Sequence, residues 1–437
     1  MSTLSINYQC TVCQNIQQSN DTCQCCGNNV FEEYSEINNI PRKTQLNIQM
    51  KRVIIIGGGI ASISVLRHLI KSSTCSITLI SNESRFPYYR TAIPKIIHNP
   101  SFESQKQFII EQQSFFDDNK IRLFLETEVI DVDIQKKSVK CQSKKSNSLF
   151  EEEYDELVFA TGGNSNIPPF IQHSNCKNLI PIHSVEDIQQ IVKCFETNEI
   201  HHVVIIGAGL SGIEIAAEIR RKYPSTNITM IEIANRILPK QLTEQASYLF
   251  TSILEEHNIH LITSCSVQTI EYVKNSTQMK ITTNNDEQKE LISDLICYSC
   301  GIHSNNEIAQ RIGCKCSRGI IVDDYMKTSL PSIYACGDCC EHNGCCYGNW
   351  TDAMKQGEIC ANTILGNIKQ FIHTPMPYFV YCFVGVYSVG CIDGDYWLKQ
   401  SNDQFIQLFY NESKTQIVGG ILIGKIVSKV SFNKAEN

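Results

Sequence analysis

Two segments of the chain repeat one arrangement of hydrophobic and small residues. Each begins with a run of Val and Ile, at residues 53–56 and 203–206, which is typical of a buried strand. Each run then breaks into glycines and continues with apolar residues at helical spacing. The small residues of the two turns are Gly57, Gly59 and Ser62 in the first and Gly207, Gly209 and Gly212 in the second. The pattern predicts a strand, a tight turn and a helix, in that order, at both places.

A glycine turn between a strand and a helix suits the phosphates of a dinucleotide. The first glycine allows the tight turn, the second lets the backbone approach the pyrophosphate, and the helix N-terminus faces the negative charge. One such turn is a weak signal, whereas two in the same context predict two bound dinucleotides. We therefore expect an α/β protein with two Rossmann-like domains, in which electrons pass from one dinucleotide to the other.

An acidic residue follows the next predicted strand in both halves. Glu83 comes shortly after the apolar stretch 76–80, and Glu232 ends the stretch 227–232. At this position a carboxylate can bind the ribose hydroxyls of the adenosine half. A carboxylate also repels a 2′-phosphate, so Glu232 favours NADH over NADPH. Arg236, four residues later, favours NADPH instead, because an Arg in this turn accepts the 2′-phosphate in other chains.

Composition sets the class of protein and excludes several partners. The 437 residues are enough for two or three domains. With a net charge of -7 and no basic block, nucleic acid is not expected as a partner. No apolar stretch reaches the roughly 20 residues of a membrane span, and the longest candidate, residues 378–392, is predicted to be a pair of strands. The N-terminus has no secretory pattern, so we expect the 22 cysteines to be mostly reduced thiols in a cytoplasmic protein.

Four cysteines near the N-terminus have the spacing of metal ligands. Cys10 and Cys13 form one C-x-x-C pair, and Cys23 and Cys26 form a second pair after a short polar loop. Such pairs place four thiolates around one metal ion, which serves as the core of a segment too small to fold alone. The ligand set suits both iron and zinc. The segment resembles a short rubredoxin-like domain, which implies iron, with a structural zinc site as the alternative.

Three further segments resemble the pyridine nucleotide-disulfide oxidoreductase superfamily. They are residues 86–95 with P-Y-Y-R and a later Lys, residues 154–163 with Y-D-E-L and A-T-G, and residues 319–338 ending in I-Y-A-C-G-D. The resemblance implies FAD at the first glycine turn and NADH at the second. It also implies that Arg90 lies on the cofactor, that Lys95 approaches the flavin ring, and that Asp338, after Gly337, binds the ribityl chain.

The remaining candidate residues follow from the same resemblance. Thr161 and Gly162 close the crossover between the two nucleotide domains. Glu214, in the helix after the second turn, corresponds to a glutamate near the junction of flavin and nicotinamide that pairs with the lysine. We therefore expect Lys95 and Glu214 to be the catalytic pair. The alternative for Glu214 is an ordinary glutamate on an amphipathic helix face.

The reactive cysteines of disulfide reductases in this superfamily are missing. The chain has neither a C-x-x-x-x-C pair after the first flavin strand nor a cysteine within residues 89–95. Residues 347–366, with W-x-x-A-x-x-Q-G, resemble NADH:rubredoxin reductases and the large subunits of NADH nitrite reductases. This resemblance implies electron transfer from NADH through FAD to the rubredoxin-like iron centre, and onward to a partner such as a rubredoxin or a di-iron protein. Trp350 is expected either beside the flavin or in the core.

These interpretations divide the chain into six parts. They are a rubredoxin-like domain at 1–40, a linker at 41–50, FAD-binding segments at 51–170 and 301–370, an NAD-binding domain at 171–300 and a small α+β domain at 371–437. The alternative function is an NADH oxidase, with the four-cysteine segment as a structural zinc site or a docking module. A second cysteine cluster at 336–346 is interpreted as free thiols, with a metal site as the alternative. The final acceptor, the metal and the oligomeric state stay open.

Overall fold

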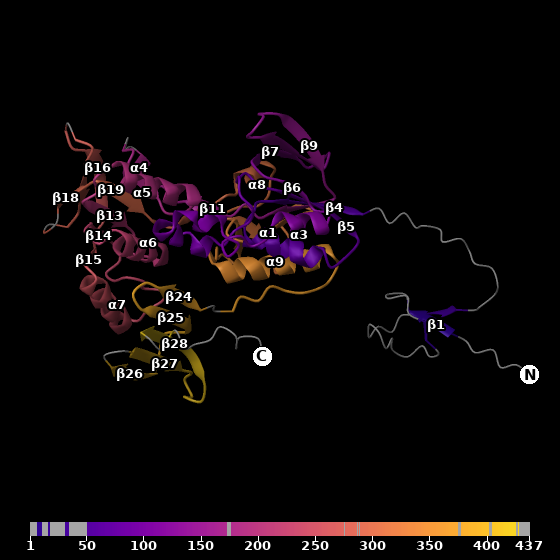
Figure 1. Ribbon diagram of the computed structural model, residues 1–437. Helices are drawn as coiled ribbons and strands as arrows, with labels where there is room; N and C mark the ends of the chain where they lie inside the picture. Colours follow the sequence, from indigo (N-terminus) through magenta and orange to yellow (C-terminus); the bar gives the residue numbers. More distant parts are fainter. Residues whose placement is uncertain are drawn as a thin grey trace, which may run out of the picture. The chain divides into compact units, whose positions relative to one another are not determined.

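The computed structural model describes residues 50–424 and Val427, apart from residues 173–175, 275, 286, 288, 375–376 and 402–403, together with three short strands near the N-terminus. The chain forms two compact units, Met1–Gln49 and Met50–Asn437, and each is described by itself. Figure 1 labels their helices and strands.

The first unit contains an antiparallel sheet of three strands. β1 (Asn7–Cys10) lies between β2 (Ile16–Gln17) and β3 (Phe31–Tyr34). Cys10 ends β1, where its backbone pairs with that of Phe31. The other three predicted metal ligands, Cys13, Cys23 and Cys26, lie outside the described residues. The four-cysteine metal site therefore stays a prediction.

The second unit begins with a parallel sheet that carries the first glycine turn. Its strands, in spatial order, are β22 (Ile333–Ala335), β10 (Glu156–Phe159), β4 (Lys51–Ile56), β5 (Cys75–Ile80) and β6 (Arg122–Phe124). All neighbouring strands run parallel, as the buried Val and Ile runs predict. Helices α1 (Ile60–Leu69) and α9 (Trp350–Ile364) lie side by side (Figure 1). Gly357 allows this close approach, because a Cβ there would lie 2.3 Å from the Ala61 carbonyl oxygen.

A second parallel sheet carries the second glycine turn. Its strands, in spatial order, are β12 (Leu179–Pro181), β19 (Leu295–Tyr298), β13 (His202–Ile206), β14 (Asn227–Ile231) and β15 (Ile259–Ile262). Helices α5 (Val185–Thr197), α6 (Leu210–Lys222) and α7 (Glu244–Glu256) connect or flank these strands. The predicted order of strand, turn and helix is thus confirmed at both repeats.

Smaller elements complete the two halves. One antiparallel meander contains β7 (Thr127–Asp133), β8 (Ser138–Ser143) and β9 (Leu149–Glu153), and another contains β16 (Val267–Tyr272), β17 (Met279–Thr283) and β18 (Glu290–Ser293). β11 (Gly163–Ser165) pairs with β20 (Ile302–Ser304), and β21 (Ile320–Val322) pairs with β23 (Cys340–His342). The short helices are α2 (Lys95–His98), α3 (Gln113–Asp118), α4 (Pro169–Gln172), α8 (Glu307–Arg311) and the 3-10 turns Arg90–Ala92 and Pro100–Ser104.

The C-terminal part forms an antiparallel sheet. Its strands, in spatial order, are β24 (Tyr378–Tyr381), β25 (Gly385–Gly390), β28 (Ile417–Gly424), β27 (Gln404–Tyr410) and β26 (Tyr396–Ser401). The strand pair predicted within residues 378–392 is confirmed, because β24 and β25 are adjacent and antiparallel. Buried side chains of this sheet, including Phe405 and Phe409, belong to the same hydrophobic cluster as Ile213 of α6 and Phe250 of α7.

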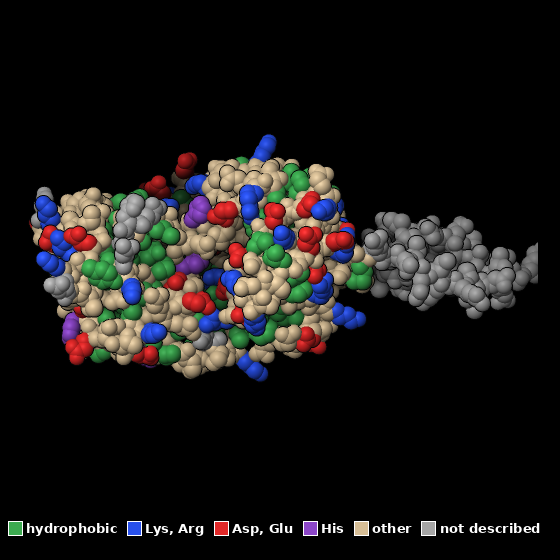
Figure 2. All heavy atoms as spheres, turned by 90° about the horizontal axis from the view of Figure 1, so that it is seen from above, with side chains coloured by type: hydrophobic (Ala, Val, Ile, Leu, Met, Phe, Trp, Pro, Cys, Tyr) green, Lys and Arg blue, Asp and Glu red, His purple; other side chains and the backbone are tan. Residues whose placement is uncertain are grey.

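The surface carries charges of both signs. On the face shown in Figure 2, basic and acidic side chains are interspersed. Among the described residues, we find no helix that combines the length and the hydrophobicity needed to cross a membrane.

Candidate functional site

The first glycine turn has a backbone that only glycine tolerates well. Gly57 has a φ of 113°, and a Cβ there would lie 2.1 Å from the Ala160 carbonyl oxygen. Gly59 begins α1 with open space where its Cβ would be. Ser62 ties the turn together, because its hydroxyl donates a hydrogen bond of 2.5 Å to the Gly57 carbonyl. A side chain at residue 57 would therefore collide with the backbone of Ala160, whereas Gly59 has free space beside it.

The second glycine turn repeats this geometry. Gly207 has a φ of 101°, and a Cβ there would lie 2.4 Å from the Ser299 carbonyl oxygen. Gly209 begins α6 with open space beside it, as Gly59 does for α1. Gly212 stands where the first turn has Ser62, and a Cβ there would lie 2.2 Å from the Gly207 carbonyl oxygen. Each turn presents open backbone at a helix start.

The two helices that follow these turns lack the usual N-terminal caps. In α1 and α6, no side chain caps the first turn and no acidic residue lies in it. By contrast, Ser184 caps α5 and Thr243 caps α7, and both of these helices have acidic residues in their first turn. Free N–H groups and the helix dipole make an uncapped N-terminus a site for an anion. A pyrophosphate group fits both positions.

The two predicted ribose-binding acids have different surroundings. Glu232 follows β14, and its carboxylate accepts hydrogen bonds from the backbone N–H groups of Ala208, at 2.8 Å, and Ala234, at 2.9 Å. This places a carboxylate directly on the second glycine turn. The guanidinium of Arg236 donates to the Pro239 carbonyl at 3.4 Å. In the first half, Glu83 forms an ion pair with Arg90.

The charge of Arg90 acts on Glu83, its ion-pair partner, and on Asp338 of the second flavin segment. Burial lowers the pKa of Arg90, but the nearby Tyr88, Glu83 and Asp338 outweigh it and raise the pKa above its usual value. Burial also raises the pKa of Asp338, and the charge of Arg90 opposes that increase. The guanidinium therefore stays charged between two carboxyl groups that lie far apart in sequence.

A cavity of about 390 Å³ joins the two halves. The predicted residues that line it are Gly59, Arg90, Gly162, Glu214, Gly337 and Asp338. Trp350 also lines the cavity, and its ring stacks on that of Tyr89 with 5.5 Å between centroids. Trp350 is partly buried and packs against the core of the first half, whereas its place beside the flavin stays a prediction.

Hydrogen bonds hold two other predicted residues, Thr161 and Gly337, in place. The Thr161 hydroxyl donates to the Asn305 carbonyl at 2.7 Å. The Gly337 N–H donates to the side-chain oxygen of Gln356 at 2.8 Å. Sequence reasoning missed the role of Gln356, although it stands within the W-x-x-A-x-x-Q-G segment. It also missed His183, a half-buried cavity residue whose pKa is lowered by burial and by Arg90.

The expected catalytic pair is not an ion pair in this structure. Burial and the charge of Glu218 raise the pKa of Glu214, Lys95 lowers it, and the net result is a pKa of about 7. The described residues Lys95 and Glu214 influence each other through their charges and do not form an ion pair. The Lys95 Nζ atom lies 5.6 Å from the centroid of the Phe102 ring. Lys95 therefore acts on Glu214 through its charge and not through direct contact.

The second cysteine cluster is mostly buried in the first half. Cys336, Cys339 and Cys340 are buried, whereas Cys345 is exposed. A hydrogen bond with Cys360, together with burial, raises the pKa of Cys336 well above its ordinary value. Cys336 lines the cavity. Within the part of the chain that the structure describes, no three side chains of His, Cys, Asp or Glu come together as a metal site.

Comparison with known proteins establishes the family. Residues 51–357 match the pyridine nucleotide-disulphide oxidoreductase family. The chain belongs to this family. The predicted superfamily and the two Rossmann-like domains are thus confirmed, and the protein is an oxidoreductase that uses a flavin and a pyridine nucleotide.

The individual proteins that this chain resembles share at most 30% sequence identity with it in the three cases that follow. An NADH oxidase of Methanocaldococcus jannaschii is 29% identical over 73% of this chain and 71% of its own length. The nitric oxide reductase FlRd-NAD(+) reductase of Citrobacter koseri is 30% identical over 67% of this chain and 73% of its own length. The crystal structure of NADH:rubredoxin oxidoreductase from Clostridium acetobutylicum has a TM-score of 0.67 and 23% identity, covering 86% of this chain and 92% of that protein. The last similarity shows a shared fold.

Proposed function

We propose that this protein oxidises NADH with a bound FAD and passes the electrons to an iron ion held by Cys10, Cys13, Cys23 and Cys26. The observation that carries this proposal is the cavity of about 390 Å³, which is lined by residues from both dinucleotide halves. A nicotinamide held by the second half and a flavin held by the first would meet there. When bound, FAD accepts a hydride from NADH and can release the electrons singly.

The residues around the first turn fit FAD. The open backbone at Gly59 and the uncapped start of α1 suit its pyrophosphate. Arg90 and Asp338 line the cavity further along, where the longer flavin half needs partners. Glu83, which forms an ion pair with Arg90, is the proposed partner of the ribose of the adenosine half.

The residues around the second turn fit NADH. The uncapped start of α6 suits the pyrophosphate, and the Glu232 carboxylate next to Ala208 would bind the ribose 2′-hydroxyl and repel a 2′-phosphate. Glu214 projects from the same helix into the cavity. A carboxyl group with a pKa of about 7 can hold or release a proton close to neutral pH. Lys95 supplies a positive charge that favours the reduced flavin.

The acceptor is proposed to lie outside the cavity. Cys336 lines the cavity, but its pKa is raised well above the ordinary value, so its thiol stays protonated and is a poor nucleophile. A thiol–disulfide step at this cysteine is therefore unfavourable. The name of the Citrobacter koseri relative connects it with a flavorubredoxin-type acceptor, which supports an acceptor of the rubredoxin type here. A rubredoxin or a di-iron protein is the proposed next partner.

The second candidate is an NADH oxidase in which the four cysteines bind zinc. The M. jannaschii relative carries that name, which favours this candidate. Zinc has no redox chemistry, so the N-terminal segment would then serve as a structural or docking module. The two candidates differ in the metal and in the path of the electrons.

Metal analysis and a visible spectrum of the purified protein, before and after anaerobic NADH, test the proposal. We expect about one iron per chain, with iron–thiolate bands that bleach together with the flavin. In Cys13→Ser, the iron is lost and flavin bleaching remains. The matched control is Cys25→Ser, which changes a neighbouring cysteine outside the predicted ligand set and should keep both signals. Zinc in place of iron, or iron that NADH does not reduce, would contradict the proposal.

A further inference from the structure

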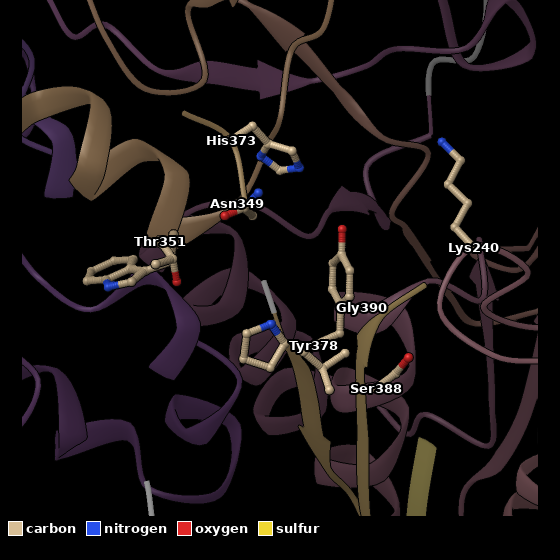
Figure 3. A pocket seen from close by; sticks show the side chains of 10 residues that line it. Lys240, Asn349, Thr351, His373, Tyr378, Ser388 and Gly390 are labelled. Atoms are coloured by element: carbon tan, nitrogen blue, oxygen red, sulfur yellow. The ribbon is translucent and has the colours of Figure 1, made fainter. Parts of the chain in front are cut away.

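A second cavity of about 210 Å³ lies where the C-terminal sheet meets α9 and the loop after β14 (Figure 3). It shares Asn349, Trp350 and Tyr378 with the larger cavity. In Figure 3, the start of α9 lies on one side and Lys240 on the other, with the Tyr378 ring between them.

The start of α9 presents two free backbone donors to this cavity. Asn349 caps the helix and uses its side-chain oxygen to accept from the Asp352 N–H at 2.9 Å. The residues between them, Trp350 and Thr351, line the cavity. In the described part of the chain, no hydrogen bond engages their backbone N–H groups. Because α9 has 15 residues, its dipole adds positive potential at this end.

Side chains from three other segments add donors to the same cavity. Ser388, on β25, is 4% exposed and lines the cavity, and its hydroxyl has no hydrogen-bond partner among the described residues. The hydroxyl of this largely buried side chain is therefore open to the cavity and can donate to a ligand there. Lys240 and Tyr378 also line the cavity, and the described residues offer no partner to the ammonium group or the phenol.

One acidic group, Asp352 in the first turn of α9, lies near this cavity and already has partners of its own. The Asp352 carboxylate is fully buried. It accepts a hydrogen bond of 2.6 Å from the Asn349 amide and lies 3.2 Å from Nδ1 of His373. His373 also lines the cavity. The other polar groups there are the Lys240 ammonium, the hydroxyls of Ser388 and Tyr378 and the two backbone N–H groups, and together they suit an anion.

We propose that this cavity, formed by the start of α9, Ser388, Lys240, Tyr378 and His373, is a binding site for a small oxyanion. Phosphate, or a phosphate group on a larger molecule, has the acceptor oxygens that these donors require. The site lies beside the mouth of the larger cavity, so its occupant would contact Trp350 and Tyr378. The proposal does not depend on the metal or on the electron acceptor proposed above.

Calorimetric titration of the FAD-loaded protein with sodium phosphate, at constant ionic strength kept with sodium chloride, tests this site. We expect saturable binding, with a Kd that rises by at least about tenfold in Lys240→Met, because a charged partner is lost. In Ser388→Ala the Kd should rise by about threefold to tenfold. The control Lys193→Met changes an exposed lysine on α5 and should leave the Kd unchanged.

Two outcomes would overturn the proposal. The first is the absence of saturable binding, or an equal Kd in all four proteins. The second is loss of phosphate binding when NAD⁺ saturates the protein, since phosphate would then have entered the nucleotide site at α6. The FAD content of each variant, measured by its absorbance, shows whether the variant has kept its fold.

Discussion

Gly57 and Gly59 are two residues apart, yet the fold requires different things of them. Gly57 combines a φ of 113° with a carbonyl oxygen 2.1 Å from the position of a Cβ. Gly59 has a φ of -86°, which any residue adopts, and open space around it. The fold itself requires glycine at residue 57, whereas the proposed binding of FAD requires glycine at residue 59.

This difference predicts two distinct phenotypes. In Gly57→Ala, the free energy of unfolding without FAD should fall by at least about 2 kcal/mol, because backbone strain and a steric clash add. In Gly59→Ala it should fall by no more than about 1 kcal/mol, while FAD binding weakens because a methyl group meets the pyrophosphate. Urea denaturation of the FAD-free proteins and a fluorescence titration with FAD measure both effects. Equal losses of stability in the two variants would contradict this explanation.

Glu214 predicts a pH dependence of stability. Its pKa is raised from 4.5 to about 7 in the folded protein, so between these values the folded state binds more protons than the unfolded state. The stability contributed by the protonated carboxyl is complete below pH 4.5 and is lost as the pH rises through about 7. Glu214→Gln should remove this fall, which amounts to at most about 3 kcal/mol.

Urea denaturation of the FAD-free protein from pH 5 to pH 8 measures the Glu214 effect. The control is Glu255→Gln, on the exposed face of α7, which should retain the wild-type dependence on pH. Parallel pH profiles for wild type and Glu214→Gln would show that Glu214 titrates normally.

At the scale of elements, the starts of α1 and α6 are unlike those of the other long helices. They lack the side-chain caps and first-turn acids that α5, α7 and α9 have. A helix start without a cap is less stable by itself. The fold keeps both starts free of caps and acids, which suits the pyrophosphate of a dinucleotide.

An acid in the first turn of α6 should therefore help the helix and harm the binding of NADH. Ser211→Glu is expected to stabilise the protein by roughly 0.3–1 kcal/mol through the helix dipole. It should also raise the KM for NADH by about tenfold or more, because it repels the pyrophosphate. Gln245→Glu, at the equivalent position of α7, is the control for the dipole and should leave the KM unchanged. Steady-state kinetics and thermal unfolding measure the two effects.

At the scale of the molecule, the C-terminal sheet is not an independent domain. Its buried residues share one hydrophobic cluster with α6 and α7 of the second half. This sheet also supplies Tyr378 to both cavities and Ser388 to the smaller one. The predicted boundary at residue 371 therefore separates segments that share a core and a site.

Removing a ring from this shared core should destabilise both parts together. Phe409 is 1% exposed, so Phe409→Ala is expected to cost about 3–5 kcal/mol and to lower the temperature of a single transition that includes the second half. Tyr381→Ala removes a ring that is 59% exposed and should cost less than about 1 kcal/mol. Calorimetry of the FAD-free proteins measures both values. A separate transition for the C-terminal sheet would contradict the shared core.

Several features of the fold and the site could be predicted from the sequence because their causes are local. Each of these signals lies within about ten residues: a run of Val and Ile, a glycine in a tight turn, or an apolar helix face. The sequence therefore predicts both strand–turn–helix units and the strand pair at 378–392. The acids after β5 and β14 were found for the same reason. Local patterns also identified the family, through segments such as 154–163 and 319–338.

Tertiary structure decided the contacts between segments that are distant in sequence. It pairs Glu83 with Arg90, keeps Lys95 out of direct contact with Glu214, and merges the C-terminal sheet with the second half. The smaller cavity needs α9, β25 and the loop that carries Lys240 to meet, and no local pattern specifies that meeting. These segments meet because they bury apolar surface against the rest of the protein, and that packing determines where their polar ends lie.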